Sequence, residues 1–483
     1  MNDVAMLIAG KDMAAEQGRS FARLNPVKGG PVTRAAAAGV ADVNTAVQAA
    51  ADAFPAWSAT GPSRRRELLL KSADALLAHQ PDFVAAMIAE TGATNAWAGF
   101  NVGFAASILR EAASATTHIT GEVIPSDVPG SLAMAIRQPV GVCAAIAPWN
   151  APVILGVRAL AMPLACGNTV IFKASESCPA VHRLIGTALH EAGLPAGALN
   201  VITNAPENAA EIVGALIDHP AVRHINFTGS TRIGRMIAER AARLLKPVLL
   251  ELGGKAPLIV LDDADIDAAV GAAAFSAFLN QGQICMSTEK IVIDERIADE
   301  FVIKLAKKAV GLPVRDPSLG PTVLGALVDP SSATRVSQLI EDAVHKGAHI
   351  AAGGSHKGPL MQATVLDRVT PEMRIYAEES FGPVVSIVRV RGDEEALRAA
   401  NDTEFGLSAA VFSRDIARAW NLSSRVQSGI CHINGPTVAD EAQMPFGGVK
   451  SSGYGRFGGN AAIHEFTTLR WITIQTGPRH YPF

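Results

Sequence analysis

The sequence predicts an α/β protein built on two largely parallel sheets, and three observations lead to this prediction. The chain has 483 residues, 49% of them hydrophobic, which is enough to bury large cores in roughly two to four domains. Short β-branched runs alternate with longer helical patterns, as a doubly wound sheet requires. Gly253 and Gly254 separate one such series from a second. We therefore expect a Rossmann-type nucleotide-binding domain followed by another α/β domain.

The first series runs without a break to the two glycines. Strands are expected at 140–147, 169–173, 201–203, 222–227 and 248–252, and helices at 179–192, 207–217 and 233–245. Gly193 and Pro195 end the first of these helices because both residues terminate helical structure. Upstream, two surface helices are expected at 43–57 and 64–79. This order of elements is typical of a nucleotide-binding sheet.

The second series begins after the two glycines. Strands are expected at 258–261 and 291–293, and helices at 266–279 and 297–310. A different composition marks residues 114–138, which are poor in helical period and rich in proline, glycine and threonine. We expect that segment to leave the first domain as an excursion.

The charge balance argues against two classes of partner. Lysine and arginine number 42 and aspartate and glutamate 45, a formal net charge of −3. Without a basic field, binding to nucleic acid or to an anionic membrane surface is not expected. The apolar run 140–157 is interrupted by Pro148, Asn150 and Pro152 and is followed by Arg158. A bilayer span tolerates these residues poorly, so we expect a buried strand, turn and helix there.

The cysteines and the start of the chain favour a cytoplasmic protein. Five cysteines form no CxxC pair and no regular disulfide spacing, which fits a reducing compartment. The first residues lack the basic region and the long apolar stretch of a signal peptide. Cys143, Cys166 and Cys431 lie in apolar runs and are interpreted as small buried hydrophobic residues.

Cys285 differs from the other cysteines in its setting. It stands in QGQICMST (281–288), after a glycine-bearing turn that closes an apolar helix, where a thiol could face a cleft. The alternative is again a buried structural thiol.

Glu251, in LLELGGK, ends a hydrophobic strand beside two glycines. It is either structural or, at the carboxyl edge of a parallel sheet where ligands bind, functional.

Three further groups lie at strand ends. FTGSTRIG (227–234) follows a strand and opens a helix, so its free N–H groups either receive a phosphate or form an ordinary helix start. Lys173 and Glu176, in FKASE, form either an exposed ion pair or contacts to ribose hydroxyls. Asn150, in PWNAP, is either a turn residue or an amide donor directed into a cleft.

Taken together, the order of these motifs resembles the NAD(P)-dependent aldehyde dehydrogenase superfamily. The matching segments are PWN (148–150), FKASE (172–176), FTGST (227–231), ELGGK (251–255), GQICMST (282–288), EESFGPV (378–384) and PFGGVKSSGYGR (445–456). They cover nearly the whole chain. NAWAGFNV (95–102), NQGQICMSTEK (280–290) and the terminal YPF are similar to bacterial aromatic aldehyde dehydrogenases of the salicylaldehyde and vanillin type.

The resemblance implies a catalytic set of three residues. Cys285 would be the nucleophile that adds to the aldehyde carbon, because only a tetrahedral thiohemiacetal can expel hydride. The Asn150 amide, with the backbone N–H of Cys285, would stabilise the oxyanion. Glu251 would act as general base on the water that hydrolyses the thioester, either in that step alone or also on the cysteine before it.

The resemblance also implies how the cofactor is held, with no metal ion involved. The matching residues are Lys173 and Glu176 for the adenosine ribose, Gly229 and Ser230 for the pyrophosphate, Glu379 and Phe381 for the nicotinamide ribose, and Trp149 nearby. A carboxylate at Glu176 would repel a 2′-phosphate, so NAD is favoured and NADP is the alternative.

The substrate pocket departs from that of acetaldehyde-type members. Ala151 and Arg158 stand where those enzymes carry bulky aromatic residues, which leaves room for a planar ring. Apolar walls are expected from Trp97, Ile284, Met286 and Phe446. Arg158 either meets a phenolic oxygen or pairs with Asp440 away from the substrate.

The implied architecture is the aldehyde dehydrogenase-like fold with a small β extension. We assign 1–118 and 139–252 to NAD binding, 253–460 to catalysis, and 119–138 with 461–483 to assembly of a homodimer or homotetramer. The implied reaction is NAD-dependent oxidation of an aromatic aldehyde (vanillin, salicylaldehyde or hydroxybenzaldehyde class) to its acid. The alternatives are a broad-specificity or a semialdehyde dehydrogenase, including a CoA-acylating type, although the latter lacks the water-activating acid found here as Glu251.

Overall fold

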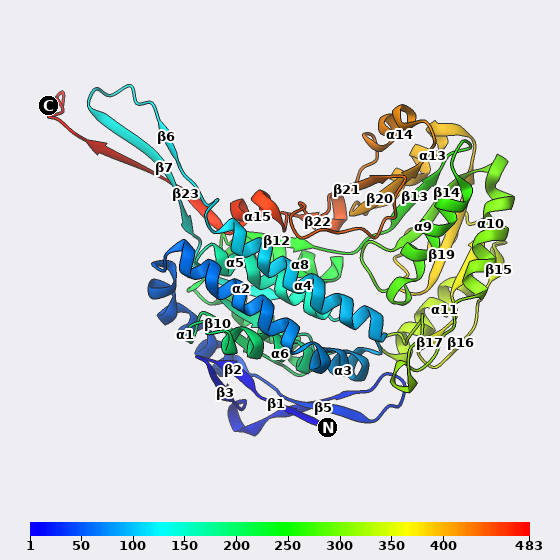
Figure 1. Cartoon of the computed structure of the whole chain (residues 1–483), viewed down its shortest axis with the longest axis horizontal. Coiled ribbons are helices and arrows are strands. Elements are labelled where there is room, and N and C mark those ends of the chain that lie inside the picture. The colour runs from blue at the N-terminus through cyan, green and yellow to red at the C-terminus, as the bar shows by residue number, and fades with distance from the viewer.

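The computed structural model describes all of residues 1–483. Figure 1 shows two α/β bodies and a long arm of strands that projects from the first body. The first body contains an eight-stranded sheet of order β22-β12-β11-β8-β9-β10-β2-β3, and the second a seven-stranded sheet of order β15-β18-β19-β14-β13-β20-β21. No helix of the structure combines the length and the apolar character needed to cross a membrane.

The first sheet is parallel at its centre and antiparallel at its edges. The parallel strands are β8 (Val142–Ile146), β9 (Thr169–Lys173), β10 (Leu199–Ile202), β11 (Val222–Thr228) and β12 (Val248–Glu251). The edge strands are β2 (Met6–Ile8), β3 (Lys11–Met13) and β22 (Gly453–Tyr454). Because β8 and β9 are buried at every position, their sequences are continuous apolar runs with no polar face.

The short helix α15 (Gly459–Glu465) packs against α4 in the first body, which contains eight further helices. They are α1 (Val40–Ser58), α2 (Pro62–Ala78), α3 (Gln80–Thr91), α4 (Asn95–Ala115), α5 (Pro152–Ala165), α6 (Pro179–Glu191), α7 (Ala209–Asp218) and α8 (Thr231–Arg243). Apolar clusters fill the space on both sides of the sheet. The direction of strand succession reverses between β8 and β11, the position at which open α/β sheets form ligand crevices.

The second body repeats this construction. Its parallel strands are β13 (Ala256–Val260), β14 (Thr288–Asp294), β18 (Thr364–Asp367), β19 (Val384–Val390), β20 (Ser408–Phe412) and β21 (Ile430–Ile433), with β15 (His349–Ala352) antiparallel at one edge. Its longer helices are α9 (Ile266–Phe278), α10 (Glu295–Val310), α11 (Pro330–His345), α13 (Gly392–Asn401) and α14 (Ile416–Ser423).

The arm is a three-stranded antiparallel sheet made from two distant parts of the chain. Strands β6 (Glu122–Ile124) and β7 (Ser131–Pro139) come from the excursion, and β23 (Thr467–Gln475) comes from the C-terminal segment. β23 pairs with β7 along its whole length, from Thr467 opposite Pro139 to Gln475 opposite Ser131. Figure 1 shows the arm extending away from both bodies, so its faces are largely open.

The expected elements agree with the structure to within three residues at each end. The structure adds features that the sequence did not indicate. Residues 453–454 form β22 inside the first sheet, although they lie in the segment assigned to the second domain. The chain start forms a further sheet from β1 (Asn2–Val4), β4 (Ser20–Leu24) and β5 (Pro31–Ala36). With three and two residues, β1 and β22 are too short to carry a recognisable hydrophobic period, whereas the longer β4 and β5 were missed.

Candidate active site

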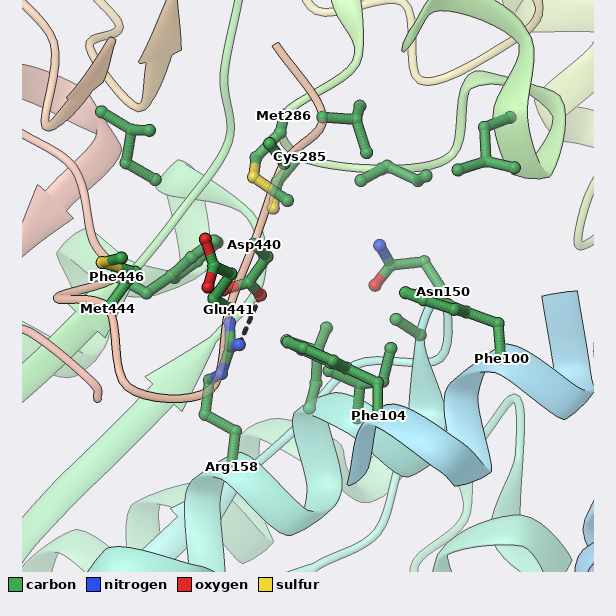
Figure 2. Close-up of a pocket in the computed structure, with 18 of the residues that line it drawn as sticks. Phe100, Phe104, Asn150, Arg158, Cys285, Met286, Asp440, Glu441, Met444 and Phe446 are labelled. Carbon is green, nitrogen blue, oxygen red and sulfur yellow. Dashed lines mark hydrogen bonds and ion pairs between the residues drawn. The ribbon is translucent and has the colours of Figure 1, made fainter. Parts of the chain in front are cut away.

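A cavity of about 610 Å³ lies where the two bodies meet, and several predicted site residues line it. Its walls come from α4, from the start of α5, from the segment 279–286 and from the loop 429–446. Figure 2 shows Cys285, Asn150 and Arg158 around this space. Of the 23 lining residues 16 are hydrophobic, so polar groups are few and each has a defined position.

The turn before Cys285 has an unusual backbone. Asn280, Gln281 and Gly282 have φ values of +48°, +57° and +69°, so three successive residues adopt the left-handed conformation. For the two residues with side chains this conformation is unfavourable and needs support. The Gln281 side chain provides it by accepting the Gly325 N–H at 2.9 Å and donating to the Ala326 carbonyl at 3.0 Å. The turn presents Cys285 to the cavity.

The Cys285 thiol lies in a desolvated setting. Burial, followed by the nearby carboxyl groups of Glu251 and Glu379, raises the pKa of this thiol well above its usual value, and Arg158 opposes the rise. A Cβ on Gly254 would lie 2.4 Å from the Cys285 carbonyl oxygen, so only glycine fits at that position. Because the resting group is a thiol, nucleophilic attack requires a proton acceptor nearby.

Glu251 is a suitable proton acceptor. It ends β12, is almost fully buried, and neither carboxyl oxygen has a hydrogen-bond partner. Burial raises the pKa of Glu251 to about 8. A carboxyl group whose pKa lies near neutrality is poised to accept and release protons.

Asn150 follows β8 and is held from three sides. Its Nδ2 donates to the Gln283 carbonyl at 2.9 Å, and its own carbonyl accepts from Trp97 Nε1 at 3.0 Å and from Asn280 Nδ2 at 2.9 Å. An amide carries two N–H hydrogens, so one remains for a ligand. Figure 2 shows this amide directed into the cavity.

One wall of the cavity is a row of aromatic rings on α4. Trp97 stacks on Phe100 with ring centroids 5.6 Å apart, and Phe100 stacks on Phe104 at 5.7 Å. Only Trp97 was predicted from the sequence. The helical spacing i, i+3, i+7 of these three residues is the signal that would have identified the other two. The remaining predicted pocket residues, Ala151, Ile284, Met286 and Phe446, also line the cavity.

Arg158 is paired in the structure. Its Nη2 donates to Oδ2 of Asp440 at 2.5 Å, and its Cζ lies 4.3 Å from the centre of the Phe446 ring. The other oxygen of Asp440, Oδ1, is buried without a partner. Of the two expectations for Arg158, the ion pair with Asp440 is therefore the one that the structure contains.

The Lys173 and Glu176 side chains lie at the end of β9. Lys173 Nζ forms an ion pair with Glu176 Oε1, and Asn204 Nδ2 donates to the same oxygen at 2.9 Å. Lys173 is buried and Glu176 is partly exposed. The second carboxylate oxygen of Glu176 has no protein donor among its hydrogen bonds, which suits a contact with a ribose hydroxyl.

The N-terminus of α8 has the features of a phosphate site. Ser230 is its N-cap residue, but no side chain caps the 13-residue helix. A Cβ on Gly229 would lie 2.4 Å from the Phe227 ring, so the backbone before the helix has no room for a side chain. Free N–H groups and the positive end of the helix dipole favour a pyrophosphate there.

Glu379 and Phe381 lie on a loop facing the first body. Glu379 Oε1 accepts the Gly254 N–H at 2.8 Å. Phe381 has a φ of +47° and meets the Trp149 ring edge to face at 5.7 Å. Burial raises the pKa of Glu379 to about 7. These groups, with the uncapped helix and the Lys173–Glu176 pair, fit a dinucleotide.

A buried carboxylate that the sequence did not identify holds this loop in place. Glu289 Oε1 accepts the backbone N–H groups of Ser380 and Phe381, each at 3.0 Å, and the Ser380 hydroxyl at 2.8 Å. Its other oxygen forms an ion pair with Lys255 Nζ at 2.8 Å. Glu289 lies on β14, so it connects the strand that follows Cys285 to the loop of Glu379.

Comparisons with known proteins identify chains of similar sequence and fold. A model of the aldehyde dehydrogenase family matches residues 13–472. The chain is 62% identical over 482 residues to a vanillin dehydrogenase of Pseudomonas fluorescens, covering 100% of both chains. It superposes with a TM-score of 0.98 on the crystal structure of a salicylaldehyde dehydrogenase from Pseudomonas putida G7 complexed with salicylaldehyde, at 50% identity and full coverage of both. The crystal structure of PnpE in complex with nicotinamide adenine dinucleotide gives 0.95 at 37% identity, with 100% and 99% coverage.

Proposed function

Since the chain belongs to the aldehyde dehydrogenase family, we propose that it oxidises an aromatic aldehyde of the vanillin, salicylaldehyde or hydroxybenzaldehyde class to the carboxylic acid, with NAD as oxidant. The observation that carries the proposal is the cavity itself, in which Cys285 and Asn150 face a wall of stacked aromatic rings. A flat, apolar space of this kind suits a benzaldehyde ring. The names of the similar enzymes support the same class of substrate.

The first step joins the substrate to the protein. Cys285 Sγ adds to the aldehyde carbon while its proton passes to Glu251, whose buried oxygens have no other partner. The carbonyl oxygen becomes an alkoxide that accepts hydrogen bonds from the free N–H of the Asn150 amide and the backbone N–H of Cys285. One such donor is worth about 3–4 kcal/mol in other enzymes.

The second step leaves an acyl group on the cysteine. The bound dinucleotide supplies a hydride acceptor for the tetrahedral carbon. The collapsing alkoxide then forms the carbonyl of a thioester on Cys285. Glu251 first releases to solvent the proton taken from Cys285; it then removes a proton from water, and the resulting hydroxide adds to the thioester. The C–S bond breaks, the carboxylic acid leaves, and Glu251 returns its proton to the Cys285 thiolate. The presence of Glu251 near Cys285 supports hydrolysis of the thioester rather than transfer of its acyl group to CoA.

The cofactor preference is proposed from Glu176. A carboxylate that accepts from a ribose 2′-hydroxyl disfavours a 2′-phosphate at the same place. The ion pair between Glu176 and Lys173 partly neutralises the carboxylate and weakens this repulsion. We therefore propose a preference for NAD with residual use of NADP.

The parts of the fold receive the corresponding roles in this proposal. The first body binds the dinucleotide through β9 and α8, and the second supplies Cys285 and the loop of Glu379. The arm serves assembly of a homodimer or homotetramer. Support for that role comes from its exposed apolar side chains, which are Val123, Ile124, Leu132, Leu469, Trp471 and Ile474.

A panel of kcat/KM values tests the function. Benzaldehyde, salicylaldehyde, vanillin, 4-hydroxybenzaldehyde and short aliphatic aldehydes are compared with NAD and with NADP. We expect at least one aromatic aldehyde to exceed the aliphatic ones by about tenfold or more, and NAD to exceed NADP. An enzyme that turned over short aliphatic aldehydes as well as any aromatic one would contradict the aromatic assignment.

A further inference from the structure

We propose that Asp440 sets the charge selectivity of the substrate cavity: by pairing with Arg158, it confines the enzyme to uncharged aldehydes and excludes those that carry a carboxylate. This inference rests on the proposed function and refines its substrate class. It also assigns a role to a residue outside the catalytic set.

The pair is part of the cavity wall. Arg158 projects from α5 and Asp440 from the loop between β21 and β22, and both line the same space as Cys285. Figure 2 shows the two side chains meeting beside Glu441 and Phe446. Their side chains are only 7% and 14% exposed, so water screens the pair weakly.

Arg158 is the only lysine or arginine among the residues that line the cavity. His432 also lines it, but burial lowers the pKa of this imidazole below its usual value and so disfavours its cationic form. The cavity therefore has one cation that could attract a substrate carboxylate. That cation already donates to Asp440 at 2.5 Å and packs over the Phe446 ring.

The remaining charged groups of the cavity wall are negative. The carboxylate of Asp440 neutralises the positive charge of Arg158, and Asp440 Oδ1 accepts no hydrogen bond. The adjacent Glu441 lines the cavity as well and is bound only by the Gln443 amide at 2.7 Å. An aldehyde with a carboxylate would thus lose its hydration and meet carboxylates without a free cation. A neutral ring carries no such penalty.

The decisive variant is Asp440→Asn, which keeps the shape of the side chain and removes its charge. Arg158 is then uncompensated, and a substrate carboxylate can take the place of the lost partner. We compare kcat/KM for 4-carboxybenzaldehyde with that for benzaldehyde in wild type and variant, so that the intrinsic reactivities cancel. The ratio should rise by about tenfold or more, the worth of a charge-assisted hydrogen bond.

Glu441→Gln is the matched control. It removes one negative charge from the same cavity but leaves the Arg158–Asp440 pair intact. Its ratio should change by less than about threefold, as expected for a partly screened charge. An unchanged ratio in Asp440→Asn, or an equal rise in Glu441→Gln, would overturn the proposal.

A double variant, Arg158→Met with Asp440→Leu, keeps the test decisive if the single variant fails to fold. Replacing a buried ion pair by apolar residues of similar volume is often tolerated. Without a free cation, the ratio should stay near the wild-type value, and a tenfold rise would contradict the inference. Oxidation of benzaldehyde by the wild type tests the proposed function separately. The charge selectivity is tested only by the ratio of kcat/KM for 4-carboxybenzaldehyde to that for benzaldehyde.

Discussion

The indole N–H of Trp97 donates to the backbone carbonyl oxygen of Asn150 at 3.0 Å. This bond connects the aromatic wall on α4 to the residue whose amide is proposed to stabilise the oxyanion. The same ring that bounds the substrate therefore helps to fix the orientation of a catalytic group.

A first prediction follows from that bond. Trp97→Phe keeps an aromatic face but removes the donor, so the backbone carbonyl of Asn150 keeps only the hydrogen bond from Asn280 Nδ2 and the residue is held less firmly. We expect kcat to fall about three- to tenfold for aromatic and aliphatic aldehydes alike, the worth of one hydrogen bond. Phe104→Ala is the comparison, because Phe104 contacts the stack and not Asn150, and it should raise KM for aromatic aldehydes selectively. A loss confined to aromatic substrates in Trp97→Phe would show that its bond to Asn150 has no catalytic effect.

The second prediction separates the proposed roles of Cys285 and Glu251. Cys285→Ala should abolish oxidation, because no thiohemiacetal forms. In Glu251→Gln the Cys285 proton must pass to solvent instead, so a burst of one equivalent of NADH should still form, more slowly than in the wild type, before the enzyme stalls at the thioester. Stopped-flow absorbance of NADH distinguishes the two variants, and full steady-state turnover in Cys285→Ala would refute the nucleophile assignment.

The third prediction concerns pH. Burial raises the pKa of Glu251 to about 8; the carboxyl groups of Glu379 and Asp440 act in the same direction, and Arg158 opposes them. Below that pKa the carboxyl is protonated and cannot accept a proton from water. When hydrolysis of the thioester limits the rate, kcat should therefore increase with pH through about 8 and then level off. A profile that is flat between pH 6 and about 9 under those conditions would argue against Glu251 as the base.

A fourth prediction addresses the loop that carries Glu379. Glu289→Gln leaves Lys255 as an unpaired buried charge and weakens the bonds to Ser380 and Phe381. The Kd for NAD, measured from quenching of tryptophan fluorescence, should rise by about tenfold. Glu378→Gln, on the same loop but in a partly exposed pair with Arg374, is the control and should change the Kd little. If Glu378→Gln raised the Kd for NAD as much as Glu289→Gln does, Glu289 would have no specific role in holding the loop of Glu379.

The fifth prediction concerns assembly. Exposed apolar residues on the arm, together with its open strand edge, should bury against a second copy of the chain. Light scattering at micromolar concentration should give a multiple of 50.3 kDa. Replacing Leu469 and Trp471 by aspartate should shift the mass toward that of one chain, whereas a wild type of about 50 kDa would exclude the assembly.

The strand ends and the tight turn that carry Cys285, Glu251 and Asn150 could be predicted from consecutive residues. Their assignment to one site came from the resemblance to the aldehyde dehydrogenase family, because each segment alone also fitted a structural role. Phe100 and Phe104 were missed, although their helical spacing from Trp97 was readable. Glu289 could not have been found in this way, because its partners Lys255 and Ser380 are 34 and 91 residues away. For Arg158 the sequence left two partners open; the structure contains the pair with Asp440, which depends on the packing of the 440 loop against α5, and contact with a ring oxygen stays a prediction.

Two strand edges, one in the first sheet and one in the arm, are covered by strands from a later part of the chain. Strand β12 is covered at its outer edge by β22, with Glu251 opposite Gly453, and β7 is covered by β23. Both covering strands lie within residues 453–475, far later in the chain than β12 and β7. Until those residues have been synthesised, the nascent protein therefore exposes two bare strand edges, one of them directly beside the proposed general base. Chains that stop before residue 453 should aggregate rather than accumulate as partly active enzyme.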